Sequence, residues 1–227
     1  MFKILFISIA FIFLSGCAST QGPTGSSDTP RSLKGSTITH SVHEKPGLFE
    51  QTRGKRVAMQ AAGLFGAIGG AVLGATMDSV SDDNVIADPA FDIGRNIVNN
   101  LAAKNSMTII DDSGIVAEST NIVALSKTYQ NADYLVNVMT VKWGFEYLAI
   151  DSDKYRVTYK ARMHLIDTIS QKVIIEMLCT FVPENESAYA APTYEDLAAD
   201  GAARLKSEFA KAAQYCTDLF LYQARSV

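Results

Sequence analysis

The stretch YRVTYKARMHLID, residues 155–167, alternates regularly between apolar or aromatic residues and polar ones. A period of two is typical of a β-strand that buries one face. The buried face is expected to carry Tyr155, Val157, Tyr159, Ala161, Met163 and Leu165, and the polar face Arg156, Thr158, Lys160, Arg162 and His164. This alternation decides the fold class, because it predicts an antiparallel sheet with one face packed on helices.

Further strands are predicted on both sides of this stretch. Residues 134–141, YLVNVMTV, are nearly all apolar, as in a central strand covered on both faces. Residues 167–171 form a tight turn, and residues 172–181 return as the second strand of a hairpin. A short strand is expected at 107–110, followed by a weakly helical stretch to about residue 130.

Two helices are predicted to cover the sheet. Asp88-Pro89 begins the first, with Asp as the N-cap and Pro at the first helical position, and Lys104-Asn105 ends it. The second runs from Thr193 to about Tyr222, and Thr193 with Asp196 resembles a capping box. Residues 85–227 are therefore predicted to form an α+β (or α/β) domain, with one mixed, mostly antiparallel sheet packed by helices.

The cysteines Cys179 and Cys216 are predicted to form a disulfide. Cys179 shares strand parity with the apolar face of 172–181, and Cys216 lies on the apolar stripe of the last helix. A bridge between them would add on the order of 4 kcal/mol of stability by the chain-entropy estimate. The alternative is two buried free thiols.

The N-terminus has the features of an export signal. Lys3 precedes an apolar run at residues 4–14, and Leu14-Ser15-Gly16-Cys17 follows. This pattern resembles the lipobox of bacterial lipoproteins. The resemblance implies that residues 1–16 are a signal peptide and that Cys17 carries diacylglycerol on its sulfur and an acyl chain on its amine, such as palmitate. The alternative is an ordinary secretory signal with a chance cysteine.

The resemblance also implies a location. Ala18 and Ser19 follow Cys17, where lipoproteins retained in the inner membrane tend to have Asp. We therefore expect a lipid-anchored protein of the outer membrane that faces the periplasm, an oxidising compartment that permits disulfides. The net charge of −4 gives no field that attracts nucleic acid, so nucleic-acid binding is disfavoured.

Residues 17–52 are predicted to be a flexible tether, because they are rich in Ser, Thr, Gly and Pro. His40 and His43 lie in this stretch with Glu44 beside them. A metal site needs more ligands held rigidly, so we interpret both histidines as solvated residues of the tether and expect no metal or other cofactor.

Residues 53–84 contain an unusual apolar segment, VAMQAAGLFGAIGGAVLGATM, at 57–77. Ala62, Gly66, Gly70 and Gly74 recur every four residues and would form a side-chain-poor strip on a helix. The segment resembles the glycine zippers of some bacterial envelope lipoproteins, although those often have two such helices. Three interpretations stay open: membrane insertion or self-association, docking on a partner, or burial in the protein's own core.

No convincing active site is present in the sequence. It lacks a G-x-S-x-G elbow, a P-loop, a dinucleotide fingerprint and a metal-ligand cluster. The polar feature with functional promise is the row formed by Arg156, Lys160, Arg162 and His164. That row is either a docking face for an acidic partner or an anionic glycan, or simply a solvated strand face.

The order of elements from 88 to 222, with the strand Ala132-Asp133-Tyr134-Leu135-Val136, resembles the periplasmic domain of certain envelope-assembly lipoproteins. These are the curli-secretion and penicillin-binding-protein-activator types. The resemblance implies a non-catalytic accessory or assembly protein that binds another envelope component. An oligomeric membrane-inserting pore or scaffold lipoprotein is the alternative, and an enzyme acting on envelope polymers comes third.

Overall fold

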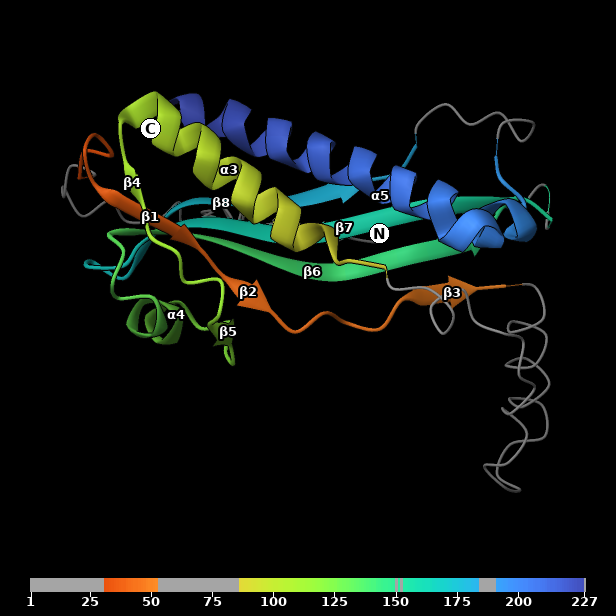
Figure 1. Cartoon of the computed structure of the whole chain (residues 1–227), viewed down its shortest axis with the longest axis horizontal. Coiled ribbons are helices and arrows are strands. Elements are labelled where there is room, and N and C mark those ends of the chain that lie inside the picture. Colours follow the sequence, from red (N-terminus) through yellow and green to blue (C-terminus); the bar gives the residue numbers. More distant parts are fainter. Residues whose placement is uncertain (1–30, 53–85, 150, 152, 184–190, 227) are drawn as a thin grey trace, which may run out of the picture. The chain divides into compact units, whose positions relative to one another are not determined.

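A six-stranded mixed sheet organises the fold (Figure 1). The computed structural model describes residues 31–52, 86–149, 151, 153–183 and 191–226, and the elements below all lie in one compact unit, Ser32–Val227. The strand order is β4-β1-β6-β7-β8, and β3 also pairs with β6. The long ladders are antiparallel and the short ones are parallel, which confirms the predicted α+β class.

The antiparallel part of the sheet matches the sequence prediction closely. Strands β6 (Tyr134–Tyr147), β7 (Tyr155–Asp167) and β8 (Lys172–Phe181) pair in that order. Strand β6 runs beyond its expected end at residue 141, because a bulge between Thr140 and Lys142 shifts its register against β7. After the bulge, Trp143 and Phe145 return to the buried face, so the apolar pattern continues out of phase.

The predicted tether is wrong for its second half. Strands β1 (Thr37–His40), β2 (Val42–His43) and β3 (Phe49–Gln51) all fall within it. β1 lies inside the sheet, between β4 (Thr108–Ile109) and β6, and pairs parallel with both. Four residues with a single large apolar side chain, Ile38, are enough for an inner strand, because the neighbouring strands supply both hydrogen-bonding ladders.

The two histidines of this stretch are only partly exposed, and both make contacts within the folded unit. The His40 ring packs edge-on against Phe91, with 5.1 Å between ring centroids, and lies over Gly94, where an added Cβ would approach its side chain at 3.2 Å. His43 Nε2 is 2.6 Å from Asn137 Oδ1. Both side chains therefore belong to the folded unit, and the domain begins well before residue 85.

Helix α3 (Pro89–Asn105) has the predicted N-terminus. Asp88 is the N-cap, and its side chain accepts a 2.9 Å hydrogen bond from the Ala90 amide. The helix ends at Ser106 in the left-handed conformation. It buries one stripe against the sheet and α5, and the stripe consists of Pro89, Ala90, Ile93, Gly94, Ile97, Val98, Leu101 and Ala102.

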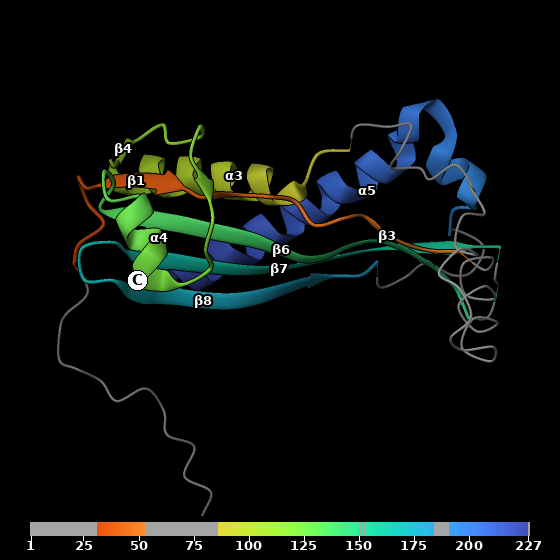
Figure 2. The same ribbon diagram turned by 90° about the horizontal axis from the view of Figure 1, so that it is seen from below.

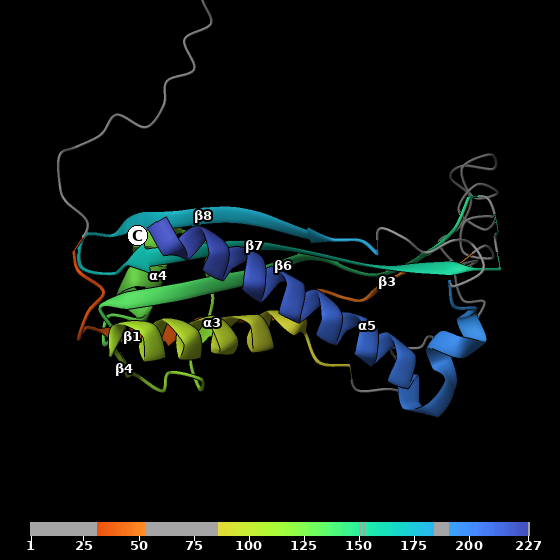
Figure 3. The ribbon, with the colours of Figure 1, turned by 90° about the horizontal axis from the view of Figure 1, so that it is seen from above.

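Helix α5 (Tyr194–Gln223) begins with the predicted capping box between Thr193 and Asp196 and continues into a 3₁₀ turn, Ala224–Ser226. A kink at residues 199–202 interrupts it, with Asp200, Gly201 and Ala202 at positive φ. Beyond the kink the helix crosses β7 and β8 beside α3 (Figure 3). Thr193 also pairs with Lys154, which fixes the start of the helix to the β6–β7 connection.

The two faces of the sheet are covered differently. Helices α3 and α5 pack on one face over the main apolar core. On the other face, helix α4 (Ile122–Thr128), inside the stretch predicted to be weakly helical, covers only one end of the strands (Figure 2). The small cluster under it consists of Ala117, Leu125, Tyr129, Leu135 and Ile166. Beside α4, β2 pairs with β5 (Val116–Ala117) in a separate two-stranded ribbon.

Candidate functional site

The face of β6, β7 and β8 that is turned away from α3 and α5 is the candidate functional site, and we call it the open face (Figure 2). Alternation along each strand selects its side chains, because every second residue points away from the helices. The bulge after Thr140 brings Lys142 and Glu146 onto the same face as the polar row of β7. The polar and charged side chains of the open face include Asn137, Lys142, Glu146, Arg156, Thr158, Lys160, Arg162, His164, Glu176 and Thr180.

Four of these side chains, Lys142, Arg156, Lys160 and Arg162, form what we call the cationic patch. The strand register places Lys142 directly opposite Lys160, and Glu146 opposite Arg156. Like charges that face each other across a strand pair repel, so the pair of lysines favours a negative group above it. The whole chain is acidic, with a net charge of −4, and the patch is therefore a local exception.

One carboxylate neutralises part of the patch. Glu146 accepts a 2.6 Å hydrogen bond from Arg156 Nη2 and lies 3.6 Å from Lys142 Nζ. Burial alone would raise the pKa of Glu146, but the bond from Arg156 and the charges of Lys142 and Arg156 hold it below its ordinary value. The Lys142 ammonium also lies 4.2 Å from the centre of the Phe49 ring, so its position is fixed from β3 as well.

The other two cations of the patch are not neutralised in this way. Lys160 and Arg162 form no ion pair with any residue that the structure describes. Arg162 lies between Met139 and Leu178 in the register, and Leu178 is 50% exposed. This end of the patch thus combines available positive charge with exposed apolar surface.

His164 was expected on a solvated strand face, and this prediction is wrong. The residue is only 6% exposed, because Asn137 on β6 and Glu176 on β8 flank it. Its Nδ1 lies 3.0 Å from Asn137 Nδ2, and its Nε2 lies 3.5 Å from Glu176 Oε1. Burial lowers the pKa of His164, and the charge of Arg162 lowers it further, whereas Glu176 acts in the opposite direction.

Asn137 connects His164 to the N-terminal part of the chain. Its Oδ1 lies 2.8 Å from Ser41 Oγ and 2.6 Å from His43 Nε2. We call Ser41, His43, Asn137, His164 and Glu176 the Asn137 cluster. It crosses the open face from the end of β1 to β8, and sequence analysis missed it entirely.

The predicted disulfide is present in the structure. Cys179 on β8 and Cys216 on α5 are bonded, with 5.7 Å between their Cα atoms, and both are fully buried. The bridge lies in the main core, between the sheet and the helices. It therefore fastens α5 to the strand that carries Glu176 and Leu178 on its other face.

Other sequence-based predictions fall outside the described residues. These are the lipidation site Cys17 and the helix-packing strip Ala62, Gly66, Gly70 and Gly74. Within residues 31–52 and 86–226, apart from the short gaps, no helix is long and apolar enough to cross a membrane. The same residues contain no group of three or more His, Cys, Asp or Glu side chains placed to hold a metal ion.

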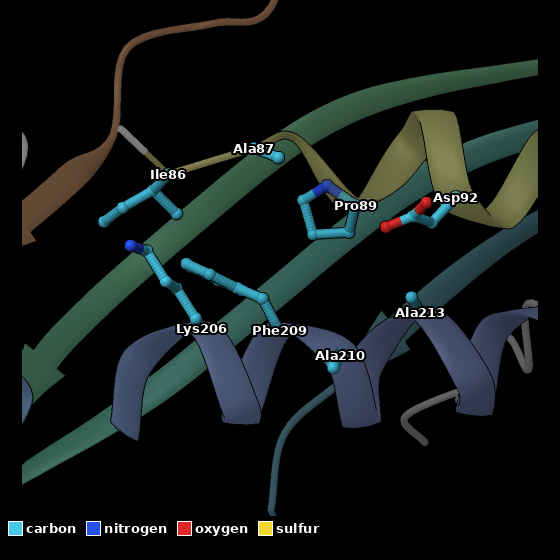
Figure 4. Close-up of a pocket in the computed structure, with 8 residues that line it drawn as sticks. All are labelled: Ile86, Ala87, Pro89, Asp92, Lys206, Phe209, Ala210 and Ala213. Atoms are coloured by element: carbon cyan, nitrogen blue, oxygen red, sulfur yellow. The ribbon is translucent and has the colours of Figure 1, made fainter. Parts of the chain in front are cut away.

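A hollow also lies on the helical side, between the start of α3 and the middle of α5 (Figure 4). It has a volume of about 260 Å³, and Phe209 and small side chains such as Ala210 line it. Its charged groups are Asp92, which is paired with Arg95 at 2.7 Å, and Lys206. Because polar groups do not converge on it, this hollow offers apolar contact rather than chemistry.

No protein-family model matches the chain, and no curated protein matches it. Among solved structures, the PelC dodecamer from Paraburkholderia phytofirmans is 10% identical, with 83% of this chain and 91% of that chain covered and a TM-score of 0.33. Lipoprotein GNA1162 from Neisseria meningitidis is 16% identical, with 67% and 87% covered and a TM-score of 0.27.

The C-terminal domain of LpoB from Salmonella enterica is 11% identical, with 65% of this chain and 83% of that chain covered and a TM-score of 0.30. The solved structures that resemble this chain thus include bacterial lipoproteins. All of these TM-scores are below 0.5, so the fold and the function of this chain rest on its own residues.

Proposed function

We propose that this chain is a non-catalytic accessory protein of the bacterial envelope, anchored by lipid on Cys17 in the outer membrane and facing the periplasm. It binds another envelope protein through the open face. The lipobox at residues 14–17 supports the anchor, and several acyl chains would make it effectively permanent. The cationic patch supports the binding role, and it points to a partner with an acidic surface.

The observation that carries the binding role is that neither Lys160 nor Arg162 forms an ion pair with a described residue. Both project from β7, the strand between β6 and β8, and Arg162 lies opposite exposed Leu178. Charges of this kind steer an acidic partner and set its orientation, while adjacent apolar surface supplies contact area. A face that only kept the protein soluble would not need a pair of directly opposed lysines.

The binding role is tested with charge reversal. Polyaspartate serves as the model acidic ligand, and its binding to the purified protein is measured at low and at high salt. Lys160→Glu with Arg162→Glu should weaken binding at low salt by about tenfold or more, because it replaces attraction with repulsion. The control variant Lys104→Glu with Lys206→Glu changes the net charge by the same amount, but on the helical side, and should leave binding nearly unchanged. Equal loss in both double variants would reject the open face as the site.

The anchor is tested separately. Cys17→Ser removes the acceptor sulfur, and the protein should then leave the membrane fraction when cells are fractionated. Wild-type protein should carry the added mass of the lipids. A Cys17→Ser protein that stays with the membrane would contradict the lipid anchor.

A second candidate function is self-assembly through the glycine strip. The four-residue recurrence of Ala62, Gly66, Gly70 and Gly74 favours close packing of backbones. The double variant Gly66→Leu/Gly70→Leu should convert an oligomer to a monomer, as judged by the mass of the mature protein in mild detergent. A wild-type protein that is already monomeric would remove this candidate.

A further inference from the structure

The Asn137 cluster joins parts of the chain that are far apart in sequence. Ser41 and His43 lie at the end of β1 and in β2, while Asn137, His164 and Glu176 come from β6, β7 and β8. Within this cluster, the hydrogen bonds that connect Ser41 and His43 to the strands all go to the amide of Asn137, which also contacts His164. Residues 41–43 are therefore held by two side chains, Asn137 on the open face and Tyr129, in addition to their backbone bonds.

The direction of each hydrogen bond in the cluster depends on where the histidine protons are. Asn137 Oδ1 accepts from Ser41 Oγ and from His43 Nε2, and Asn137 Nδ2 donates to His164 Nδ1. This arrangement needs a proton on His43 Nε2 and a free lone pair on His164 Nδ1. The proton of neutral His164 then lies on Nε2, which faces Glu176 Oε1 at 3.5 Å.

Protonation of the histidines changes which hydrogen bonds the Asn137 amide can form with them. A second proton on His164 would place an N–H of the ring against the N–H of Asn137, and these two donors repel. Rotation of the amide by half a turn would present Oδ1 to His164 and turn Nδ2 toward His43. Neutral His43 can accept that bond after a change of tautomer, but protonated His43 cannot, because both of its ring nitrogens are then donors.

We propose that the Asn137 amide is a proton-sensitive clasp, which fixes residues 41–43 to the open face while at least one of the two histidines is neutral and releases them when both are protonated. With one proton added, an orientation of the amide still satisfies both rings. With two, none does. The clasp is therefore expected to open in acid.

Charged and titratable groups from several elements surround the clasp. Glu176 on β8 favours the protonated form of His164, and Arg162 on β7 opposes it. Asp88 at the start of α3 interacts electrostatically with His43, and the hydroxyl of Tyr129 accepts the amide of Val42 at 3.1 Å. Because burial and Arg162 together lower the pKa of His164, release is expected on the acid side of the ordinary histidine range.

Two backbone amides report directly on the clasp. The N–H of Ser41 donates to the carbonyl of Val136 at 3.0 Å, and the N–H of Val42 donates to Tyr129. Hydrogen-exchange protection factors of these amides are measured by NMR in the full-length protein at neutral pH and at about pH 5. We expect about a tenfold loss of protection at the acid pH, the size of one ordinary hydrogen-bonding contribution.

Two variants test the mechanism from opposite directions. Asn137→Asp places an acceptor between the rings, so both protonated histidines can donate to it and protection should be kept or should rise in acid. His43→Gln removes one titrating ring, keeps an amide that can donate or accept, and should abolish most of the acid loss. His40→Gln is the control for the remaining histidine of the chain: His40 Nδ1 lies 3.3 Å from the Ser41 carbonyl and its ring packs on Phe91, but it forms no hydrogen bond with Asn137 in the described structure.

The outcomes separate cleanly. Loss of protection in wild type and in His40→Gln, with none in His43→Gln, supports the clasp. An equal acid loss in wild type and His43→Gln would overturn it. The same would follow if protection at Ser41 and Val42 did not change with pH in wild type.

Discussion

The hydroxyl of Thr140 donates a 2.5 Å hydrogen bond to Oδ1 of Asp88, so the N-cap of α3 is fastened to the strand beneath it. The hydroxyl of Tyr159 lies 3.0 Å from the same Thr140 oxygen. Burial raises the pKa of Asp88, although the bonds from Thr140 and from the Ala90 amide oppose that effect. Asp88 thus caps the helix and binds the sheet at the same time. Its negative charge is partly removed from water, and this burial opposes ionisation in the folded protein.

Asp88→Asn should be at least as stable as wild type at neutral pH, because asparagine caps helices well and carries no buried charge. Asp88→Ala should lose about 1 kcal/mol, since it removes the cap. The pKa of Asp88 is higher in the folded chain than in the unfolded one, so its contribution to stability falls as pH rises from the ordinary aspartate value of 3.8. Asp88→Asn should lack that decline. Urea denaturation across acid pH measures both effects, and equal losses in the two variants would contradict this account.

Replacing Cys179 and Cys216 with serine should lower the free energy of unfolding by about 4 kcal/mol, because the bridge closes a loop with a sequence separation of 37. Both sulfurs are fully buried, so a reductant should act on the folded protein only when it opens. Denaturation with and without dithiothreitol measures the effect. Cys17→Ser is the control, and its stability should not respond to the reductant differently from wild type.

Thr217→Val should stabilise the protein by about 1 kcal/mol, since the buried Thr217 hydroxyl has no hydrogen-bond partner among the described residues and valine has nearly the same shape. Thr193→Val is the matched comparison on the same helix. That change removes the capping box and should cost about 1 kcal/mol. Thermal denaturation of the two variants should therefore shift in opposite directions, and a shift of both in the same direction would contradict the assignment.

Gly144→Ala should be among the most disruptive small changes in the sheet. Gly144 has a φ of +147°, and a Cβ at this position would overlap the carbonyl of Phe49. The pairing of β3 with β6 would have to open, at a cost of about 2 kcal/mol or more. Loss of exchange protection confined to β3 would show local opening. A stability equal to wild type would show that β3 contributes nothing to the fold.

Local sequence patterns predicted those parts of the fold that depend on one segment at a time. The alternation at 155–167, the Asp88-Pro89 start of α3 and the Thr193–Asp196 capping box are of this kind. The disulfide could also be predicted from the sequence, because strand parity places Cys179 and helical periodicity places Cys216 on faces that point toward the same core.

The remaining features depend on pairing between distant segments, which local patterns do not encode. Strand β1 is too short and too polar to stand out, and it is recognisable only from its partners β4 and β6. The burial of His164 follows from Asn137 on the next strand, and the position of Lys142 follows from a bulge. The candidate site was thus predicted for β7 alone, and its contributions from β2, β6 and β8 were missed.

The entry of β1 and β3 into the sheet places both borders of residues 53–85 in one folded unit. Thr52 follows β3, Ile86 precedes α3, and both belong to the unit that contains the sheet. Lys45 Nζ donates to the Ile86 carbonyl at 3.2 Å, which ties the stretch before β3 to the start of the segment that leads into α3. Both ends of residues 53–85 are therefore fixed by the same folded unit.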